Sequence, residues 1–317
     1  GKSATYSNIE PRIGFSWAFG NDYAFKASYA KMNQYVHVLS NSGLDLPTDL
    51  WVPSTAKIAP QRSNQIALGI AKDLPRDITL SIEGYYKKMD NILSYREGAF
   101  FKTDAAGDDQ MQMTQPWEQS VVVGQGKSYG AELMLQRKVG KFSGWMGYTL
   151  SWTKYQFDEL NNGKEFYPKQ DCRHNISLVG IYQPSPTLKL SATWVYTTGA
   201  VADVARASYE LPIRNPLPSN YVGNSQTVVD YGEKDSFRKS AYHRLDVGAQ
   251  FIKPKKRGER IWELGVYNLY CNANPFFVGP KSSNISNMGM GVSDRYVGLY
   301  QYSMLNFIPA ISYTRKF

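Results

Sequence analysis

The chain has 317 residues, of which 42% are hydrophobic and 14% aromatic, and its formal net charge is +9. No apolar run approaches the ~18 residues of a membrane-spanning helix, so a helical membrane protein is excluded. Much of the basic excess lies in the turn KPKKRGER and in scattered lysines. Without a helix-borne basic face or a recognition motif, this charge does not indicate a nucleic-acid-binding protein.

Apolar and polar side chains alternate with a period of two along most of the chain, which is the pattern of β-strands. It is clearest in two arms that flank the short break VGK. The predicted strands, in chain order, are Ile9–Phe19, Tyr23–Met32, Asn64–Lys72, Ile78–Met89, Lys127–Lys138, Phe142–Phe157, Asp171–Tyr182, Leu188–Thr197, His243–Phe251, Ile261–Tyr270 and Tyr300–Phe317.

Many of these strands are longer than the five or six residues usual in soluble domains. A tilted strand needs about 9–11 residues to cross a bilayer, and Tyr and Trp are frequent where lipid meets water. The sequence therefore predicts an all-β fold, a transmembrane antiparallel β-barrel. The alternative is a soluble β-sandwich that is rich in tyrosine.

The connections between the predicted strands alternate strictly between short and long. Outer-membrane barrels have short periplasmic turns and long extracellular loops, so the first residue is expected on the extracellular side. Eleven strands is an odd number, whereas bacterial single-chain barrels are even-stranded. We therefore expect residues 1–317 to be the C-terminal part of one barrel domain of about 22 strands, a class with a plugged lumen. The plug is expected outside this chain.

The alternation also predicts the two faces of the wall. The residues expected to face the membrane are Phe15, Trp17, Leu133, Leu135, Leu150, Leu178 and Trp194. The opposite face carries polar and charged residues, which are tolerated within a membrane where they meet water or one another. These inward residues are Arg12, Lys26, Glu83, Lys87, Glu132, Gln136, Lys189, Arg244 and Asp246.

Catalytic and metal-binding patterns are weak, and we expect no enzyme, no cofactor and no metal site. His37, His174 and His243 lack metal-ligand spacing. Asp171 and His174 could serve a hydrolase together with a loop serine, but a structural hydrogen bond at the top of a strand is favoured.

Three further local features have a structural interpretation that is favoured over a functional one. The cluster Asp104, Asp108 and Asp109 could bind Ca²⁺, with a solvated loop as the favoured alternative. Gly124-Gln125-Gly126 is interpreted as a bend at the start of a strand. Cys172 and Cys271 are expected to be free thiols, with a single disulfide as the alternative.

Long loops on a rigid barrel are free to vary and to bind. Aromatic and basic loop residues are therefore the candidates for ligand contact, with loop packing or lipopolysaccharide contact as the alternative. These candidates are Tyr35, Trp51, Trp117, Tyr155, Arg206, Tyr221 and Tyr231.

Four segments resemble the C-terminal barrel half of TonB-dependent outer-membrane receptors, and the resemblance covers nearly all of the chain. They are SYGAELMLQRKVGKFSGWMGYTLS (128–151), DCRHNISLVGIY (171–182), NLYCNANPFFV (268–278) and IPAISYTRKF (308–317). The most similar branch carries a carboxypeptidase-regulatory-like extension and is related to SusC-type importers.

This resemblance implies a 22-stranded, plugged barrel in the outer membrane of a Gram-negative bacterium. It implies uptake of a scarce nutrient, powered by a TonB complex that acts through an N-terminal part not in this chain. The implied partners are the plug, the remaining strands, outer-membrane lipid and lipopolysaccharide, and a surface lipoprotein. Phe317 matches the aromatic terminal residue used in barrel assembly, whereas Arg315 departs from the apolar residue usual two positions earlier. A passive porin and an outer-membrane enzyme remain the alternatives.

Overall fold

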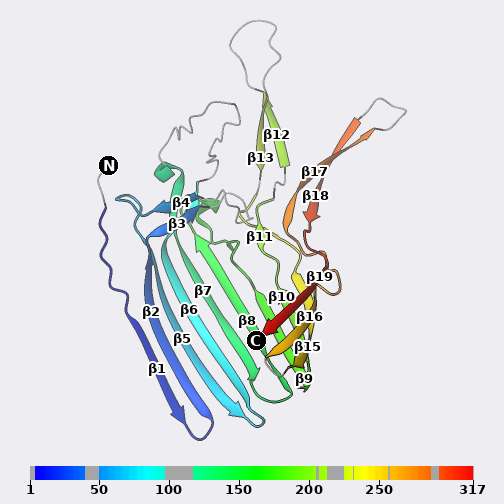
Figure 1. Ribbon diagram of the computed structural model, residues 1–317. Helices are drawn as coiled ribbons and strands as arrows, with labels where there is room; N and C mark the ends of the chain where they lie inside the picture. Colours follow the sequence, from blue (N-terminus) through cyan, green and yellow to red (C-terminus); the bar gives the residue numbers. More distant parts are fainter. Residues whose placement is uncertain are drawn as a thin grey trace, which may run out of the picture.

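The computed structural model describes residues 4–39, 50–96, 117–204, 207–212, 225–230, 232–255, 258–286 and 293–316. Its main body is one antiparallel sheet of eleven strands, which forms a curved wall (Figure 1). The strands, in spatial order, are β1 (Arg12–Phe19), β2 (Tyr23–Gln34), β5 (Gln61–Leu74), β6 (Ile78–Tyr95), β7 (Val121–Arg137), β8 (Phe142–Gln156), β9 (His174–Ser185), β10 (Leu188–Thr197), β15 (Tyr242–Pro254), β16 (Glu259–Tyr267) and β19 (Ile308–Lys316).

The long connections contain two-stranded ribbons that were not predicted from the sequence. Each ribbon pairs two strands of the same long connection, and the ribbons rise above one end of the wall (Figure 1). They are β3 (Val36–Leu39) with β4 (Leu50–Pro53), β11 (Val201–Ala202) with β14 (Phe237–Arg238), β12 (Ala207–Pro212) with β13 (Ser225–Asp230), and β17 (Phe277–Ser286) with β18 (Ser293–Tyr302). Two single-turn 3₁₀ helices, η1 (Trp117–Gln119) and η2 (Asn161–Gly163), complete the described elements. No helix in this part of the chain is long and apolar enough to cross a membrane.

All eleven predicted strands are confirmed, but several boundaries were wrong. The last predicted strand is in fact two elements, because Tyr300 and Tyr302 pair with β17 in a separate ribbon and the wall strand begins only at Ile308. The first strand begins at Arg12, after Pro11, which has no N–H to donate to a ladder. Asp171 precedes β9 and is not part of it.

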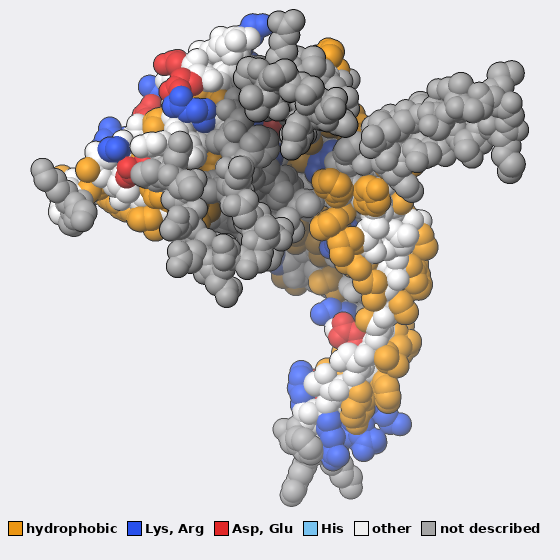
Figure 2. All heavy atoms as spheres, turned by 90° about the horizontal axis from the view of Figure 1, so that it is seen from above, with side chains coloured by type: hydrophobic (Ala, Val, Ile, Leu, Met, Phe, Trp, Pro, Cys, Tyr) orange, Lys and Arg blue, Asp and Glu red, His pale blue; other side chains and the backbone are white. Residues whose placement is uncertain are grey.

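The strand register aligns the predicted apolar stripe on one face of the sheet, which we call the outer face. One row runs from Trp17 through Phe25, Ile70, Ile82, Leu133 and Tyr148 to Ile176. All seven residues predicted to face the membrane lie on this face, and Phe15 and Trp17 are each 57% exposed. Hydrophobic side chains cover long stretches of the wall in Figure 2. Contact of these residues with lipid stays a prediction.

Two rows of aromatic residues bound the apolar part of the outer face. On β8, Trp152 and Phe142 are ten residues apart, which is about 33 Å of strand and about 25 Å when the strand is tilted by ~40°. That height matches the apolar band of outer-membrane barrels, about 25 Å. The upper row contains Tyr29, Tyr86, Tyr129 and Trp152, and the lower row contains Phe142, Phe251, Trp262 and Tyr313.

Candidate functional site at the long-loop rim

Two small hydrophobic cores hold the loops onto the upper ends of β6, β7 and β8. We call them the first and second rim cores. The first consists of Met89, Ile92, Val122, Phe157, Leu160 and Phe166. The second consists of Leu39, Val52, Ile58 and Val121. Because these side chains are at most 7% exposed, the loop bases are fixed by apolar burial, the dominant favourable term in folding.

A glycine in β7 is required for the first rim core to form. A Cβ atom on Gly124 would lie 2.4 Å from the backbone oxygen of Gln156 and from the ring of Phe157. Gly124 therefore lets two neighbouring strands and the Phe157 ring approach closely. The interpretation of Gly124-Gln125-Gly126 as a bend at strand entry was wrong, because these residues lie inside β7 and the irregularity is a bulge at Asn91 on β6.

The described candidates for ligand contact divide into two groups. Tyr155 packs half-buried against the first rim core, and Trp117 packs against the second. Tyr35 and Trp51 are 38% and 68% exposed. Trp51 lies in the ribbon of β3 and β4 at the rim, and Tyr35 directly precedes that ribbon. Tyr35 and Trp51 are thus the two described candidates with open surface. Arg206, Tyr221, Tyr231 and the terminal Phe317 lie outside the described residues.

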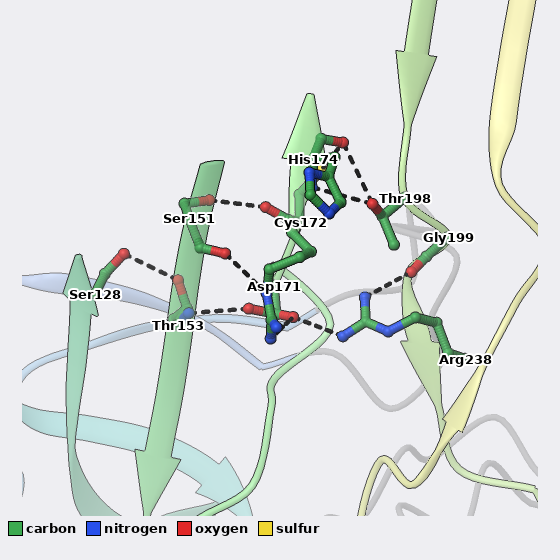
Figure 3. Close-up of polar contacts among 10 residues, drawn as sticks. Ser128, Ser151, Thr153, Asp171, Cys172, His174, Thr198, Gly199 and Arg238 are labelled. Carbon is green, nitrogen blue, oxygen red and sulfur yellow. Dashed lines mark hydrogen bonds and ion pairs between the residues drawn. The ribbon is translucent and has the colours of Figure 1, made fainter. Parts of the chain in front are cut away.

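Asp171 joins three segments at the rim, and its carboxylate is fully buried. The backbone N–H of Thr153 donates to Oδ1 at 2.9 Å, and Arg238 donates to Oδ2 at 2.6 Å. Arg238 also donates to the backbone oxygen of Gly199 at 2.9 Å (Figure 3). We call these four residues the Asp171 clamp. The expected structural hydrogen bond at this strand top is confirmed.

A second set of contacts ties the loop after β8 to the connection between β10 and β15. The N–H of Lys234 donates to the side chain of Asn161 at 3.2 Å, and the Lys234 ammonium pairs with Asp203 at 3.0 Å. The N–H of Asp235 donates to Asp203 at 2.5 Å. Burial, followed by repulsion from Asp203, raises the pKa of Asp235 from 3.8 to about 6. Together with the Asp171 clamp, these contacts fix the base of the loop after β8 to the base of the connection between β10 and β15.

The arrangement does not assemble a hydrolase from Asp171 and His174. Both Asp171 oxygens are held by Thr153 and Arg238, and His174 Nδ1 instead contacts the Tyr148 hydroxyl at 2.9 Å. His37 contacts the Ser54 hydroxyl at 3.0 Å, and burial lowers its pKa. These geometries are structural, since the Asp171 carboxylate accepts from a backbone N–H and an arginine, and the His174 ring contacts a tyrosine hydroxyl.

The remaining polar candidates are two cysteines and three aspartates. Cys172 and Cys271 are free thiols, as expected. Burial raises the pKa of the Cys172 thiol, which disfavours the reactive thiolate. Asp104, Asp108 and Asp109 lie outside the described residues. Elsewhere, the described residues include no cluster of His, Cys, Asp and Glu that could hold a metal ion.

An antiparallel wall with an apolar outer face, aromatic rows at both edges, short turns at one end and long loops at the other defines an outer-membrane-type β-barrel wall. Residues 1–269 match the family described as TonB dependent receptor-like, beta-barrel. The chain therefore belongs to the TonB-dependent receptor family, a family of receptors and transporters in the outer membrane of Gram-negative bacteria. The family and fold predictions are confirmed.

Solved structures share this fold at low sequence identity. The ferric yersiniabactin uptake receptor of Yersinia pestis has a TM-score of 0.54 and 11% identity, over 96% of this chain and 37% of that one. The ferripyoverdine receptor of Pseudomonas aeruginosa has a TM-score of 0.50 and 13% identity, over 84% and 30%. The FrpB iron transporter of Neisseria meningitidis has a TM-score of 0.50 and 15% identity, over 85% and 36%.

The chain thus spans about a third of the length of these receptors. No curated protein matches the sequence. The expected relation to the SusC-type branch stays a prediction.

Proposed function

We propose that the full-length protein imports a scarce nutrient across the outer membrane with energy from a TonB complex, and that this chain supplies the C-terminal wall and its extracellular loops. The observation that carries the proposal is the eleven-stranded wall, together with the match of residues 1–269 to the family. Exposed Tyr35 and Trp51 are the proposed ligand contacts among the described residues. A surface lipoprotein stays a prediction.

Ferric chelates are the first substrate class to test, because the three similar structures are of a ferripyoverdine receptor, an iron transporter and a ferric yersiniabactin uptake receptor. In the native bacterium, deletion of the full-length gene should abolish accumulation of one radiolabelled ferric chelate from a panel of hydroxamates and catecholates. Removing TonB or dissipating the proton-motive force should abolish it equally. Uptake that survives both treatments and declines smoothly with solute size would instead establish a passive porin.

The inner face offers a contact for the plug. Glu83 and Glu132 are direct partners across β6 and β7, and neither forms an ion pair within the described residues. Carboxylates directly opposite each other repel, which destabilises the pair unless a cation lies between them. We propose that a lysine or arginine of the plug neutralises Glu83 and Glu132, since a charged residue inside a barrel is stable where it finds water or a partner.

Replacing both carboxylates tests this contact. In the full-length receptor, Glu83→Gln with Glu132→Gln should loosen the plug, because the cation between them loses its partners. The expected result is greater sensitivity of cells to a large antibiotic such as vancomycin, at an unchanged receptor level. Gln136→Asn, on the same face, is the matched control. Identical antibiotic sensitivity in the double variant and the control would refute the plug contact.

A further inference from the structure

A row of lysines crosses five neighbouring strands on the outer face, immediately above the upper aromatic row. Lys31 is the register partner of Asn64, Asn64 of Lys88, Lys88 of Lys127, and Lys127 of Lys154. On each of their strands, the lysines lie two residues from Tyr29, Tyr86, Tyr129 and Trp152, and so point to the same side of the sheet. We call Lys31, Lys88, Lys127 and Lys154 the lysine row.

The lysine row is only partly neutralised. Lys127 and Lys154 share the Glu165 carboxylate at 2.5 and 3.3 Å, and Lys88 lies 3.8 Å from Asp90. Four lysines and two carboxylates leave an excess of two positive charges. Like charges directly opposite each other on neighbouring strands repel, so an anion bound along the row would relieve the repulsion.

A groove of about 430 Å³ opens on the outer face directly beneath the lysine row. Its floor is formed where Gly84 and Ala131 pair across β6 and β7. Its apolar walls are formed by Ile66 and Leu68 on one side and by Trp152 on the other. The cause of the groove is side-chain size, because two small residues are in register between rows of large ones. An apolar groove of this volume, on a face that is predicted to meet lipid, suits a hydrocarbon chain.

A cation stacked on the upper aromatic row adds to this surface. The Arg173 guanidinium lies 4.9 Å from the ring centre of Trp152 and 5.2 Å from that of Tyr167. Lys154 lies 5.7 Å from the ring centre of Tyr167. Such cation–ring contacts hold the charged groups at the height of the aromatic row, where a lipid headgroup begins.

We propose that this surface is a lipopolysaccharide site, in which the lysine row binds the phosphates of lipid A and the groove holds one of its acyl chains. The inference rests on the proposed function only in taking the long loops as extracellular. The lysine row lies at the long-loop end, in the leaflet that contains lipopolysaccharide. Neighbouring strands are about 4.8 Å apart, so the row extends over roughly 19 Å. That width suits a disaccharide with a phosphate at each end better than a single phospholipid headgroup.

The test measures binding of bisphosphorylated lipid A to delipidated full-length receptor by native mass spectrometry. Lys88→Gln, Lys127→Gln and Lys154→Gln together should raise the Kd about a hundredfold at low salt, at about fivefold per lysine near an anionic lipid. The loss should shrink as salt is added, because ions screen exposed charges. Lys253→Gln with Arg260→Gln is the matched control, since these exposed outer-face cations lie at the short-turn end.

A second variant tests the groove with the lysine row intact. A Cβ atom on Gly84 would meet only the Gly130 backbone oxygen, at 3.9 Å, so a side chain can start from this position without moving the backbone, and Gly84→Leu is the variant chosen. Its side chain would fill the groove. We expect the Kd for lipid A to rise about tenfold at low and high salt alike, because the lost contact is apolar. Heat-modifiable migration on gels should be unchanged in every variant, which confirms a folded barrel.

Three results would overturn the proposal. The first is a triple-lysine variant that binds lipid A within twofold of the wild type. The second is a control variant that loses as much affinity as the triple-lysine variant. The third is a wild-type receptor that binds phosphatidylglycerol as tightly as lipid A. The proposed function can fail separately, because uptake independent of TonB would leave lipid A binding unchanged.

Discussion

Replacement of Asp171 by alanine should lower the free energy of local unfolding at the long-loop rim by about 3 kcal/mol. Removal of one member of a buried ion pair leaves its partner without compensation. The Asp171 carboxylate is fully buried, whereas the Arg238 side chain is 30% exposed and can recover some hydration. Arg238→Met leaves the buried carboxylate with the Thr153 N–H and, at 3.8 Å, the Arg173 guanidinium, so it should cost about as much as Asp171→Ala. Asp171→Asn should cost less, since the amide oxygen still accepts from the Thr153 N–H.

Hydrogen exchange of the full-length receptor can measure this loss at the rim. Exchange should accelerate in residues 158–173 and 232–241, with the lower parts of the wall strands unchanged. The double variant Asp171→Ala with Arg238→Met should cost less than the sum of the single variants, by about 1–3 kcal/mol. Lys164→Gln is the control, because its pair with Glu233 is exposed and contributes at most about 1 kcal/mol. Equal exchange in Asp171→Ala and Lys164→Gln would show that the clamp has no special role.

The loop around Asp235 should become less stable as pH rises from about 4 to about 6. The folded pKa of Asp235 is about 6, above its ordinary value of 3.8, so the folded loop binds the proton more tightly than the unfolded loop. Stability from this group is therefore fully present below the unfolded pKa and is lost as pH rises through the folded pKa. Burial is the main cause, Asp203 adds to it, and Lys234 and Lys169 oppose it.

Asp235→Asn should remove this pH dependence. At neutral pH the variant loop should be more stable by up to about 3 kcal/mol, at 1.36 kcal/mol for each pKa unit. Exchange of the amides in residues 232–238, followed in the full-length receptor at about pH 4 and about pH 7, measures the effect. Glu233→Gln is the control, because its side chain is 65% exposed. A wild-type loop that is equally protected at both values, after correction for the intrinsic exchange rate at each pH, would contradict the raised pKa.

The wall could be predicted from the sequence because strand alternation is a local signal. Trp17, Leu133 and Leu178 were assigned to one face from their own strands, and the register then placed all three on the same face of the sheet. The last strand was placed wrongly for a related reason. Tyr300 and Tyr302 alternate like a wall strand, and only their pairing with β17 reveals a separate ribbon.

The rim could not be predicted in the same way, because its contacts join residues that are distant in sequence. Arg238 follows Asp171 by 67 residues, and no periodic pattern links them. Tyr155 and Trp117 have the composition of ligand contacts, but packing against the rim cores occupies them. The lysine row was missed although each lysine was visible, since its meaning depends on register across five strands.

The order of strands in the wall has a consequence for how the protein is made. Apart from the ribbons in its long connections, every wall strand pairs with the next wall strand along the chain. Local pairing of this kind keeps loop-closure entropy small at each step. An apolar surface this extensive cannot be left facing water, so hairpins should be added to the growing edge only as they enter the bilayer. Biogenesis then proceeds from one wall strand to the next, and the membrane itself acts as the template.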